Sequence, residues 1–329
     1  MEELLKVENL KKYFPVSLGF FRSLASTQHI FVKAVDNVSF DIKKKEIFGL
    51  AGESGSGKTT TGRVILRLIE PTAGKAIFEG KDIFEMDIDP KVLRRQMQMI
   101  FQDPYESLNP RFTVYDIISE PLKIHKVYST EKEVQEKVLE RLEEVKITPP
   151  EQFLLRYPHE LSGGQRQRVA LARSLVLDPE FVVADEPVSM LDVSIRAEVL
   201  NLMFELIQKH NVSFLYITHD LALARHICDR VAIMYLGKIV EMSAAEKIVY
   251  EPLHPYTKAL IVAVPIPDPN ARRSEAVIKG EIPSPINPPA GCRFHTRCPS
   301  YIGDICRTKE PELLDVGGEH YVACHLYNK

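Results

Sequence analysis

A glycine-rich segment near the N-terminus has the residue types of a phosphate-binding loop. Residues 52–59 read Gly-Glu-Ser-Gly-Ser-Gly-Lys-Thr and follow the short apolar segment 46–51, which predicts a buried strand. Residues 60–69 have helical spacing, and a strand–loop–helix context is the one in which this motif holds nucleotide phosphates. Glycines let backbone N–H groups converge on phosphate oxygens, and the helix N-terminus adds its positive dipole end. The sequence therefore predicts a nucleoside triphosphate site.

Two side chains of the loop and two carboxylates further along the chain suggest how the phosphates and a metal ion would be held. We expect Lys58 to neutralise the β and γ phosphates and Thr59 to ligate Mg²⁺. A second apolar strand, 180–184, delivers Asp185 and Glu186 at its carboxyl end, which suits a metal–nucleotide site at the edge of a parallel sheet. Asp185 is predicted to hold Mg²⁺ and Glu186 to polarise the attacking water. The predicted loop residues are Gly52, Glu53, Ser54, Gly55, Ser56, Gly57, Lys58, Thr59 and Thr60.

A second glycine-containing motif lies much further along the chain. It precedes residues 169–172, which have the apolar periodicity of a helix. A serine followed by two glycines at a helix start offers backbone N–H groups and a hydroxyl to an anion. The motif consists of Leu161, Ser162, Gly163, Gly164 and Gln165. It predicts a second anion-binding helix N-terminus.

With these motifs the chain resembles the nucleotide-binding subunit of an ABC transporter, over roughly residues 5–240. The second motif matches the family signature in full. Gln102 matches the Q-loop, Asp192 the D-loop and His219 the switch histidine, and all stand in the family's order. The resemblance implies that the signature, with Asp192, acts in trans on ATP held by a partner subunit. One protomer would then supply half of each site.

The resemblance also implies the roles of single residues. Tyr13 stands where the family places an aromatic ring that stacks on adenine, whereas Met190 departs from the small residue usual at its position. The implied ligands are ATP and Mg²⁺. The residues implied in catalysis are Glu186, which activates water, His219 and Lys58, which stabilise the γ-phosphate, and Gln102, which with Asp185 and Thr59 organises Mg²⁺ and water.

The alternation of strands and helices predicts an α/β fold, and the resemblance implies the P-loop NTPase (ABC ATPase) class with a mostly parallel sheet core. We expect an ABC ATPase domain over 1–264 and a Pro-rich linker with a small cysteine-bearing extension over 265–329. The resemblance assigns about 103–160, including a charged helix over 130–145, to a helical subdomain whose groove near Gln102 receives a coupling helix of a membrane subunit. Predicted strands are 32–42, 46–51, 75–79, 97–101, 180–184, 213–218 and 229–235.

Composition narrows the class of partner. A formal net charge of −3 gives no basic field for nucleic acid, so we expect no nucleic-acid partner. The longest apolar runs are too short to span a bilayer, and the N-terminal residues lack the pattern of a signal peptide. We therefore expect a protein on the cytoplasmic side of the cell membrane. A transport role would require separate membrane subunits.

Four of the five cysteines lie in the last 38 residues, with the spacing C-x5-C-x7-C-x17-C. In a cytosolic chain, clustered cysteines favour metal over disulfides, and four thiolates suit zinc or an iron–sulfur cluster. A disulfide pair or free thiols remain alternatives, and His295, His320 and His325 keep mixed ligation possible. Cys228, in a helical pattern, is predicted to be a small buried apolar residue. The four clustered cysteines are Cys292, Cys298, Cys306 and Cys324.

Here the resemblance narrows to the ATPases of oligopeptide/dipeptide ABC importers. The segments 291–299 and 320–326 look like their C-terminal signature, in which four cysteines bind a [4Fe-4S] cluster, and 253–260 also matches. The insert 17–31 resembles the F-type of the two ATPase subunits. The implied partners are a D-type sister ATPase, two membrane permeases and an extracytoplasmic solute-binding protein.

The resemblance leaves cargo and role partly open. Peptides are the implied cargo, but members of the family also carry oligosaccharides or nickel. A soluble ABC ATPase acting on ribosomes or DNA is a second hypothesis, although that class often has two ATPase units or a long coiled-coil insert. A third is a redox sensor in which the cluster controls hydrolysis. We expect the cluster to be structural, because four cysteine ligands leave no open position.

Overall fold

The chain forms two compact units in a computed structural model that describes residues 2–16, 30–85, 88–103, 107–263, 278 and 280–327. Unit 1 comprises residues 1–2, 43–46 and 85–216, and unit 2 comprises 3–42, 47–84 and 217–329. The predicted insert 17–31 lies almost wholly outside the described residues, as does the proline-rich stretch 265–277. The predicted boundary at 264/265 stays a prediction.

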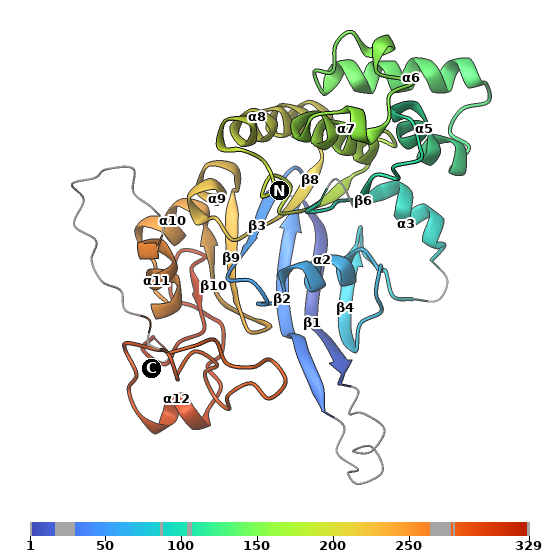
Figure 1. The fold of residues 1–329 in the computed structure, drawn as a ribbon. Coiled ribbons are helices and arrows are strands. Elements are labelled where there is room, and N and C mark those ends of the chain that lie inside the picture. The colour runs from blue at the N-terminus through green and yellow to red at the C-terminus, as the bar shows by residue number, and fades with distance from the viewer. Residues whose placement is uncertain are drawn as a thin grey trace, which may run out of the picture. The chain divides into compact units, whose positions relative to one another are not determined.

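Unit 2 contains an antiparallel sheet with the strand order β2-β1-β4-β5 (Figure 1). β1 pairs antiparallel with β4, with Leu5 opposite Phe78, and β4 pairs antiparallel with β5. Alternation in β1 buries Leu5 and Val7, and a register shift between Glu8 and Lys11 accompanies the burial of Leu10. The strands are β1 (Glu3–Pro15), β2 (Phe31–Lys43), β4 (Ala73–Phe78) and β5 (Lys81–Asp82).

Unit 2 also holds strands in the order β11-β12-β10-β9-β3. β3 and β9 are parallel, whereas β9–β10, β10–β12 and β12–β11 are antiparallel. The strands are β3 (Ile47–Ala51), β9 (Arg230–Tyr235), β10 (Lys238–Ala244), β11 (Leu314–Asp315) and β12 (Tyr321–Val322). The helices are α2 (Lys58–Ile65), α9 (Leu221–Ile227), α10 (Ala245–Tyr250), α11 (Pro255–Ala263) and α12 (Asp304–Thr308).

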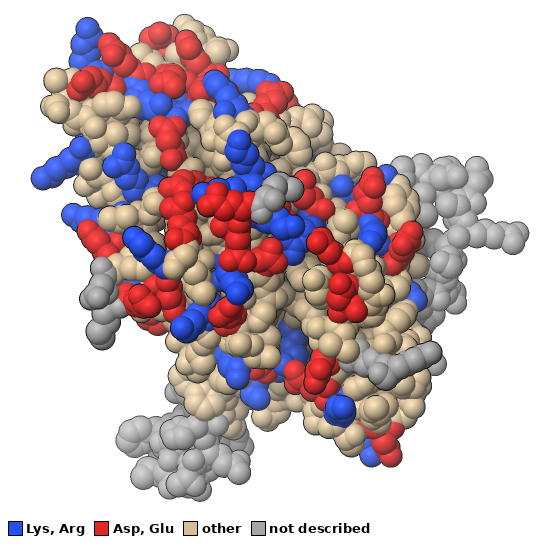
Figure 2. Space-filling view, turned by 180° about the vertical axis from the view of Figure 1, so that it is seen from behind, with Lys and Arg blue, Asp and Glu red and all other residues tan. Residues whose placement is uncertain are grey.

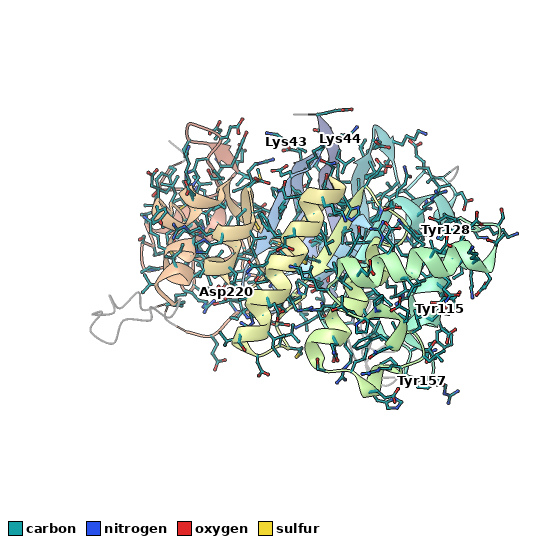
Figure 3. The ribbon with its side chains drawn as sticks, turned by 90° about the horizontal axis from the view of Figure 1, so that it is seen from above. Lys43, Lys44, Tyr115, Tyr128, Tyr157 and Asp220 are labelled. Carbon is teal, nitrogen blue, oxygen red and sulfur yellow. The ribbon has the colours of Figure 1, made fainter. Side chains whose placement is uncertain are left out.

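Unit 1 places helices around the parallel pair β6 and β7, with Ile100 opposite Ala184. Thr113 and Thr130 close capping boxes at the starts of α5 and α6. Tyr115, Tyr128 and Tyr157 lie in the helical part of this unit (Figure 3). The strands are β6 (Met97–Ile100), β7 (Phe181–Asp185) and β8 (Ser213–Thr218), whose last two residues belong to unit 2. The helices are α3 (Pro90–Gln96), α5 (Val114–Ile124), α6 (Glu131–Glu144), α7 (Gly163–Leu175), α8 (Val193–His210) and the 3₁₀ turns Pro150–Gln152 and Pro158–Glu160.

All seven predicted strands are confirmed, within about two residues at each end. The predicted helix over 130–145 is confirmed as α6, and Cys228 is buried as expected. The pairs β3–β9 and β6–β7 are parallel, as expected for the sheet core. The antiparallel strands β1, β5, β10, β11 and β12 were not predicted from the sequence.

The surface agrees with the small net charge. Figure 2 shows acidic and basic side chains intermingled on the face in view, which is not dominated by charges of one sign. Within the described ranges, none of the helices combines the length and apolar character that a membrane span requires.

Candidate functional site

The predicted phosphate loop of unit 2 is held in a conformation that requires glycine. Gly52 has a φ of 151° and Gly57 a φ of 107°. A Cβ atom on Gly52 would lie 2.2 Å from the carbonyl oxygen of Met234, and one on Gly57 would lie 2.1 Å from that of Ala34. The loop therefore runs in backbone contact with β9 and β2, which leaves no room for a side chain at either position.

Lys58 lies inside this loop. Its side chain is 5% exposed, and its Nζ donates to the carbonyl oxygens of Gly52, at 2.7 Å, and Glu53, at 2.9 Å. The loop is thus curled around an ammonium group. Lys58 is also the first residue of α2, and its N-cap Gly57 has no side chain to cap the first N–H groups. Backbone donors and a cation therefore converge, as a phosphate site requires.

Three further groups fix the loop from outside. The Tyr256 hydroxyl accepts from the Glu53 backbone N–H at 2.9 Å, and the Gly237 N–H donates to the Ser56 carbonyl at 2.7 Å. Arg297 Nη1 lies 3.1 Å from Glu53 Oε2. Sequence reasoning gave Tyr256 and Arg297 no role in the site, because their separation from the loop in sequence hides the contact.

Tyr13 also belongs to unit 2, and its orientation is fixed by a carboxylate. Its hydroxyl donates to Asp36 Oδ1, and Lys33 Nζ lies 5.6 Å from the ring centroid. Burial and the Asp36 hydrogen bond raise the pKa of Tyr13 to about 12. Burial alone would raise the pKa of Asp36, but the Tyr13 hydroxyl and the charges of Lys238 and Arg293 outweigh it and lower that pKa.

Unit 1 brings two of the predicted catalytic residues together. β6 and β7 are parallel neighbours, so the residues that follow them meet at one edge. Gln102 Nε2 donates to Glu186 Oε2 at 3.2 Å. Glu186 has a φ of 44°, in the left-handed region that non-glycine residues rarely adopt, and Asp185 before it is 3% exposed. This edge therefore presents a carboxylate and an amide in contact.

The signature motif starts a helix as predicted. Ser162 is the N-cap of α7, its hydroxyl accepts from the Gln165 N–H at 3.2 Å, and the Gln165 side chain accepts from the Ser162 N–H at 3.0 Å. A Cβ atom on Gly164 would lie 2.7 Å from Ile195 Cγ2. Gly164 thus allows the start of α7 to pack closely against Ile195 of α8.

The D-loop lies in the same unit. Asp192 is the N-cap of α8, and Arg196 Nη2 lies 3.3 Å from the Leu191 carbonyl oxygen, which closes the turn. Met190, the departure from the family pattern, is 60% exposed. In unit 2, His219 is exposed after β8, and Asp220 caps α9 through the N–H groups of Ala222 and Leu223.

The four C-terminal cysteines lie close enough for their charges to interact, and all are free thiols. The backbone N–H groups of Phe294, Ser300 and Leu326 donate to the thiols of Cys292, Cys298 and Cys324, each two residues earlier. Burial, reinforced by the neighbouring thiols, raises the pKa of Cys292 to about 12. The expected alternative of a disulfide is absent among these described cysteines.

The predicted metal site is not assembled as such. Among the described residues, no three His, Cys, Asp or Glu side chains are placed to hold a metal ion. The three histidines considered for mixed ligation have other contacts. His295 contacts the Cys292 carbonyl at 2.8 Å, His320 contacts Glu241 at 2.7 Å, and His325 contacts the Lys309 carbonyl at 2.8 Å.

Comparison with known proteins decides the family. The ABC transporter family model matches residues 35–189, and the model described as the oligopeptide/dipeptide transporter C-terminal region matches 240–306. The chain is 49% identical to the oligopeptide transport ATP-binding protein AppF of Bacillus subtilis (strain 168), over 99% of this chain and 98% of that protein. This chain belongs to the ATP-binding proteins of oligopeptide-type ABC transporters. As a member of this family it is an ATP-hydrolysing enzyme, with ATP and Mg²⁺ as its ligands.

Other relatives agree with this family. The putative oligopeptide transport ATP-binding protein YkfD of the same Bacillus strain is 48% identical over 98% of this chain and 95% of its own length. Among solved structures, the ATP-binding cassette MJ0796 bound to ADP and Pi matches with a TM-score of 0.62 and 27% identity, covering 74% of this chain and 99% of that one. The cbiO1 protein of Clostridium perfringens matches with a TM-score of 0.64 and 25% identity, over 76% and 92% of the two chains. These structures confirm the P-loop ABC ATPase fold.

Proposed function

We propose that this chain hydrolyses ATP to power import of peptides through an ABC transporter. The observation that carries the proposal is the near-full-length identity of 49% to a protein named for oligopeptide transport, across both the ATPase and the C-terminal region. The glycine loop around Lys58 and the Gln102–Glu186 contact supply the chemistry such a subunit needs.

The residue roles in this proposal are those that the family implies, and the contacts of Lys58 and of Gln102 with Glu186 support two of them. Lys58 and the N–H groups at the start of α2 bind the phosphates. Thr59, Asp185 and Gln102 would hold Mg²⁺, which would neutralise charge on the phosphates. Glu186 takes a proton from the attacking water, and its hydrogen bond from Gln102 orients the carboxylate. His219 donates a hydrogen bond toward the γ-phosphate, and Tyr13 stacks on adenine.

The assembly in this proposal is built from several chains. The bare helix start at Ser162, Gly163 and Gly164, with Asp192, binds the γ-phosphate of ATP on a D-type sister ATPase. The present chain is the F-type subunit, and the pair docks on the cytoplasmic side of two membrane permeases. A solute-binding protein outside the membrane delivers the cargo.

The cysteines fit an iron–sulfur cluster by their donor set. Four free thiols lie within electrostatic range of one another, and three of them accept a backbone N–H, the kind of contact that tunes cluster potentials. Cys292, Cys298, Cys306 and Cys324 would hold a [4Fe-4S] cluster, or zinc as the alternative. When bound, the group would cross-link the C-terminal segment through these four thiols. Iron, acid-labile sulfide and zinc assays on anaerobically purified protein distinguish the two.

The catalytic assignment is tested by Glu186→Gln. Loss of the carboxylate removes the base but leaves the phosphate loop unchanged. ATP turnover should therefore fall about 10²- to 10⁴-fold while ATP still binds. The measurements are steady-state phosphate release and binding of a fluorescent ATP analogue.

Lys58→Ala is the matched control, because it should lose binding as well as turnover. Normal hydrolysis by the Glu186→Gln protein would remove this carboxylate from the mechanism. The cargo is tested separately in vesicles that contain the complete transporter. Peptide-loaded binding protein should stimulate ATP turnover, and stimulation by oligosaccharide or nickel instead would overturn the peptide assignment.

A further inference from the structure

Two arginines of the cysteine-bearing segment, Arg293 and Arg297, are almost fully buried. Their exposed fractions are 7% and 8%. A guanidinium group needs partners at such depth, because its desolvation is costly. Each arginine finds a carboxylate more than 240 positions away in sequence, one on the phosphate loop and one on the strand that orients Tyr13. Both contacts lie within unit 2.

We propose that Arg293 and Arg297 are positioning residues for ATP, through which the cysteine-bearing segment sets the shape of the nucleotide site. The inference rests on the proposed function, since it assigns roles in the same nucleotide site. It adds two residues, each acting on a different part of the nucleotide.

Arg297 acts on the phosphate loop. Its Nη1 lies 3.1 Å from Glu53 Oε2 and 3.4 Å from the Tyr235 hydroxyl. The Glu53 backbone N–H is held at the same time by the hydroxyl of Tyr256, whose ring lies 4.7 Å from that of Tyr235. Glu53 is therefore fixed by both its side chain and its backbone. Its carbonyl oxygen also accepts from Lys58, so its position bears directly on the ammonium group.

Arg293 acts on the adenine side. Its Nη2 pairs with Asp36 Oδ2, its Nη1 donates to the Leu236 carbonyl, and Asp36 Oδ1 accepts from the Tyr13 hydroxyl. The ring that is proposed to stack on adenine is thus two contacts away from Arg293. Removal of the guanidinium would leave Asp36 with Lys238 Nζ, at 3.9 Å, as its remaining cationic partner at ion-pair distance among the described residues.

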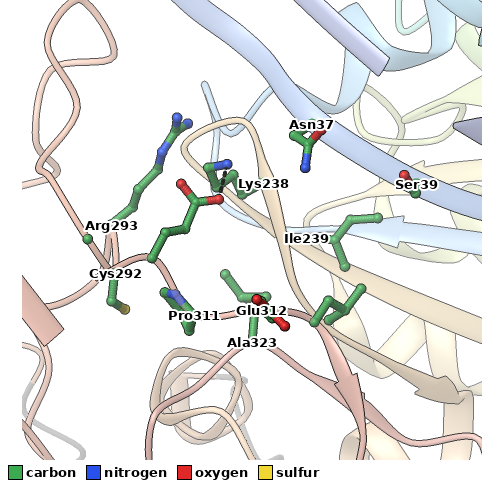
Figure 4. A pocket seen from close by; sticks show the side chains of 13 residues that line it. Asn37, Ser39, Lys238, Ile239, Cys292, Arg293, Pro311, Glu312 and Ala323 are labelled. Carbon is green, nitrogen blue, oxygen red and sulfur yellow. Dashed lines mark hydrogen bonds and ion pairs between the residues drawn. The ribbon is translucent and has the colours of Figure 1, made fainter. Parts of the chain in front are cut away.

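A cavity of about 500 Å³ lies beside Arg293 (Figure 4). Cys292, Arg293 and Lys238 line it together with Asn37 and Ser39 of β2. Arg293 therefore borders open space on one side, and its polar contacts to Asp36 and to the Leu236 carbonyl fix its position. Arg293 directly follows Cys292, and Arg297 directly precedes Cys298, so whatever anchors these thiols also places the two guanidinium groups.

The proposed roles of Arg297 and Arg293 predict that the two variants lose affinity for different ligands. Arg297→Gln loosens the phosphate loop, so the Kd should rise about fivefold to tenfold for both the fluorescent analogue mant-ATP and inorganic tripolyphosphate. Arg293→Gln loosens Tyr13, so the Kd should rise for mant-ATP but not for tripolyphosphate. Tyr13→Phe, which keeps the ring and removes the hydroxyl, should behave as Arg293→Gln does. The experiment uses the full-length protein, with displacement titrations for tripolyphosphate.

Arg307→Gln is the control from the same segment, because that side chain is 64% exposed and pairs only with its helix neighbour Asp304 among the contacts described. A Glu53→Gln background tests the contact itself, since Arg297→Gln should add no further loss there. Arg297→Lys should recover part of the affinity.

The outcomes separate the inference from the proposed function. Failure of the unmodified protein to bind mant-ATP would refute the proposed function. Normal binding by the unmodified protein, together with Arg293→Gln and Arg297→Gln values equal to that of Arg307→Gln, would overturn the inference. Equal losses for both ligands with Arg293→Gln would overturn its Tyr13 arm. Additive losses in the Glu53→Gln background would overturn the loop arm, even if the variants were less stable.

Discussion

At the residue scale, the site depends on polar side chains that specific contacts hold in place. Glu186 adopts a left-handed φ of 44° and contacts Gln102 at 3.2 Å. A left-handed backbone costs about 1–2 kcal/mol for a residue with a Cβ. That cost is tolerated here because the strained turn aims the carboxylate at the edge of the sheet.

His254 gives the protein a pH-dependent stability. The ring is fully buried, Nδ1 accepts from the Tyr256 N–H at 3.0 Å, and burial lowers its pKa from 6.5 to about 3. The unfolded chain binds a proton below pH 6.5 that the folded chain refuses until about pH 3. The contribution of neutral His254 to the free energy of unfolding is therefore full above pH 6.5. It falls as the pH decreases, by about 2 kcal/mol between pH 7 and pH 5.

His254→Asn should remove this dependence, because the Asn side-chain oxygen keeps the bond to Tyr256 but does not titrate. Urea unfolding at pH 7 and pH 5 measures it. Between pH 7 and pH 5 the unmodified protein should lose about 2 kcal/mol more stability than the variant loses. An unchanged pH slope in the variant would show that other groups cause the acid sensitivity.

The site residues that could be predicted from the sequence are those identified by a motif of neighbouring residues. The loop glycines, Ser162 at a helix start and Glu186 after a strand all follow from neighbours within a few positions. Arg293 and Arg297 had no such signal, since an arginine in a loop usually belongs to a solvated surface. Their partners Asp36 and Glu53 lie 257 and 244 positions away, so only the folded chain reveals the pairs.

At the element scale, the predicted parts were those with a strong period or a strong stop signal. The buried strands β3, β7 and β8 are continuous apolar runs and were found within about two residues. β10 was missed because it follows β9 after a two-residue turn and holds the charged Glu241 at its centre. That carboxylate is fully buried and accepts from the Leu253 and His254 N–H groups, a contact that no local pattern predicts.

The loop before α2 supplies a matched pair of variants. Gly57→Ala forces a Cβ atom to 2.1 Å from the Ala34 carbonyl oxygen, so the turn must shift and ATP affinity should fall at least tenfold. Gly55 also has a positive φ, of 76°, but a Cβ atom there meets nothing within 4 Å. Gly55→Ala should therefore cost only the left-handed strain of about 1–2 kcal/mol. Titration with mant-ATP and thermal melting compare the two, and equal effects would refute the steric argument.

At the scale of the whole molecule, the C-terminal segment is part of the core of unit 2. β12 pairs with β10 through Glu241 opposite Val322, and His320 contacts the buried Glu241 at 2.7 Å. The C-terminal family model itself begins at residue 240, inside this sheet. The sequence predicted an appended linker and extension over 265–329, because cysteines and prolines are concentrated in that part of the chain.

Deletion of residues 314–329 should therefore destabilise unit 2. It removes β12, which pairs with the edge of β10 opposite β9, and it removes His320, a polar partner of Glu241. The variant should therefore melt at lower temperature and aggregate. Leu314→Ser is the control, since that side chain is 41% exposed and its backbone pairing stays. A deletion variant with the same melting temperature as the unmodified protein would show that residues 314–329 form a separate module.

The contact between Arg297 and Glu53 also has a consequence for synthesis. The two residues are 244 positions apart. At translation rates of 5–20 residues per second, roughly 12–50 s pass between the addition of Glu53 and that of Arg297. A nascent chain on the ribosome therefore carries its phosphate loop for most of its synthesis without this ion pair. The contact forms only after Arg297 has been added, so until then Glu53 lacks this partner.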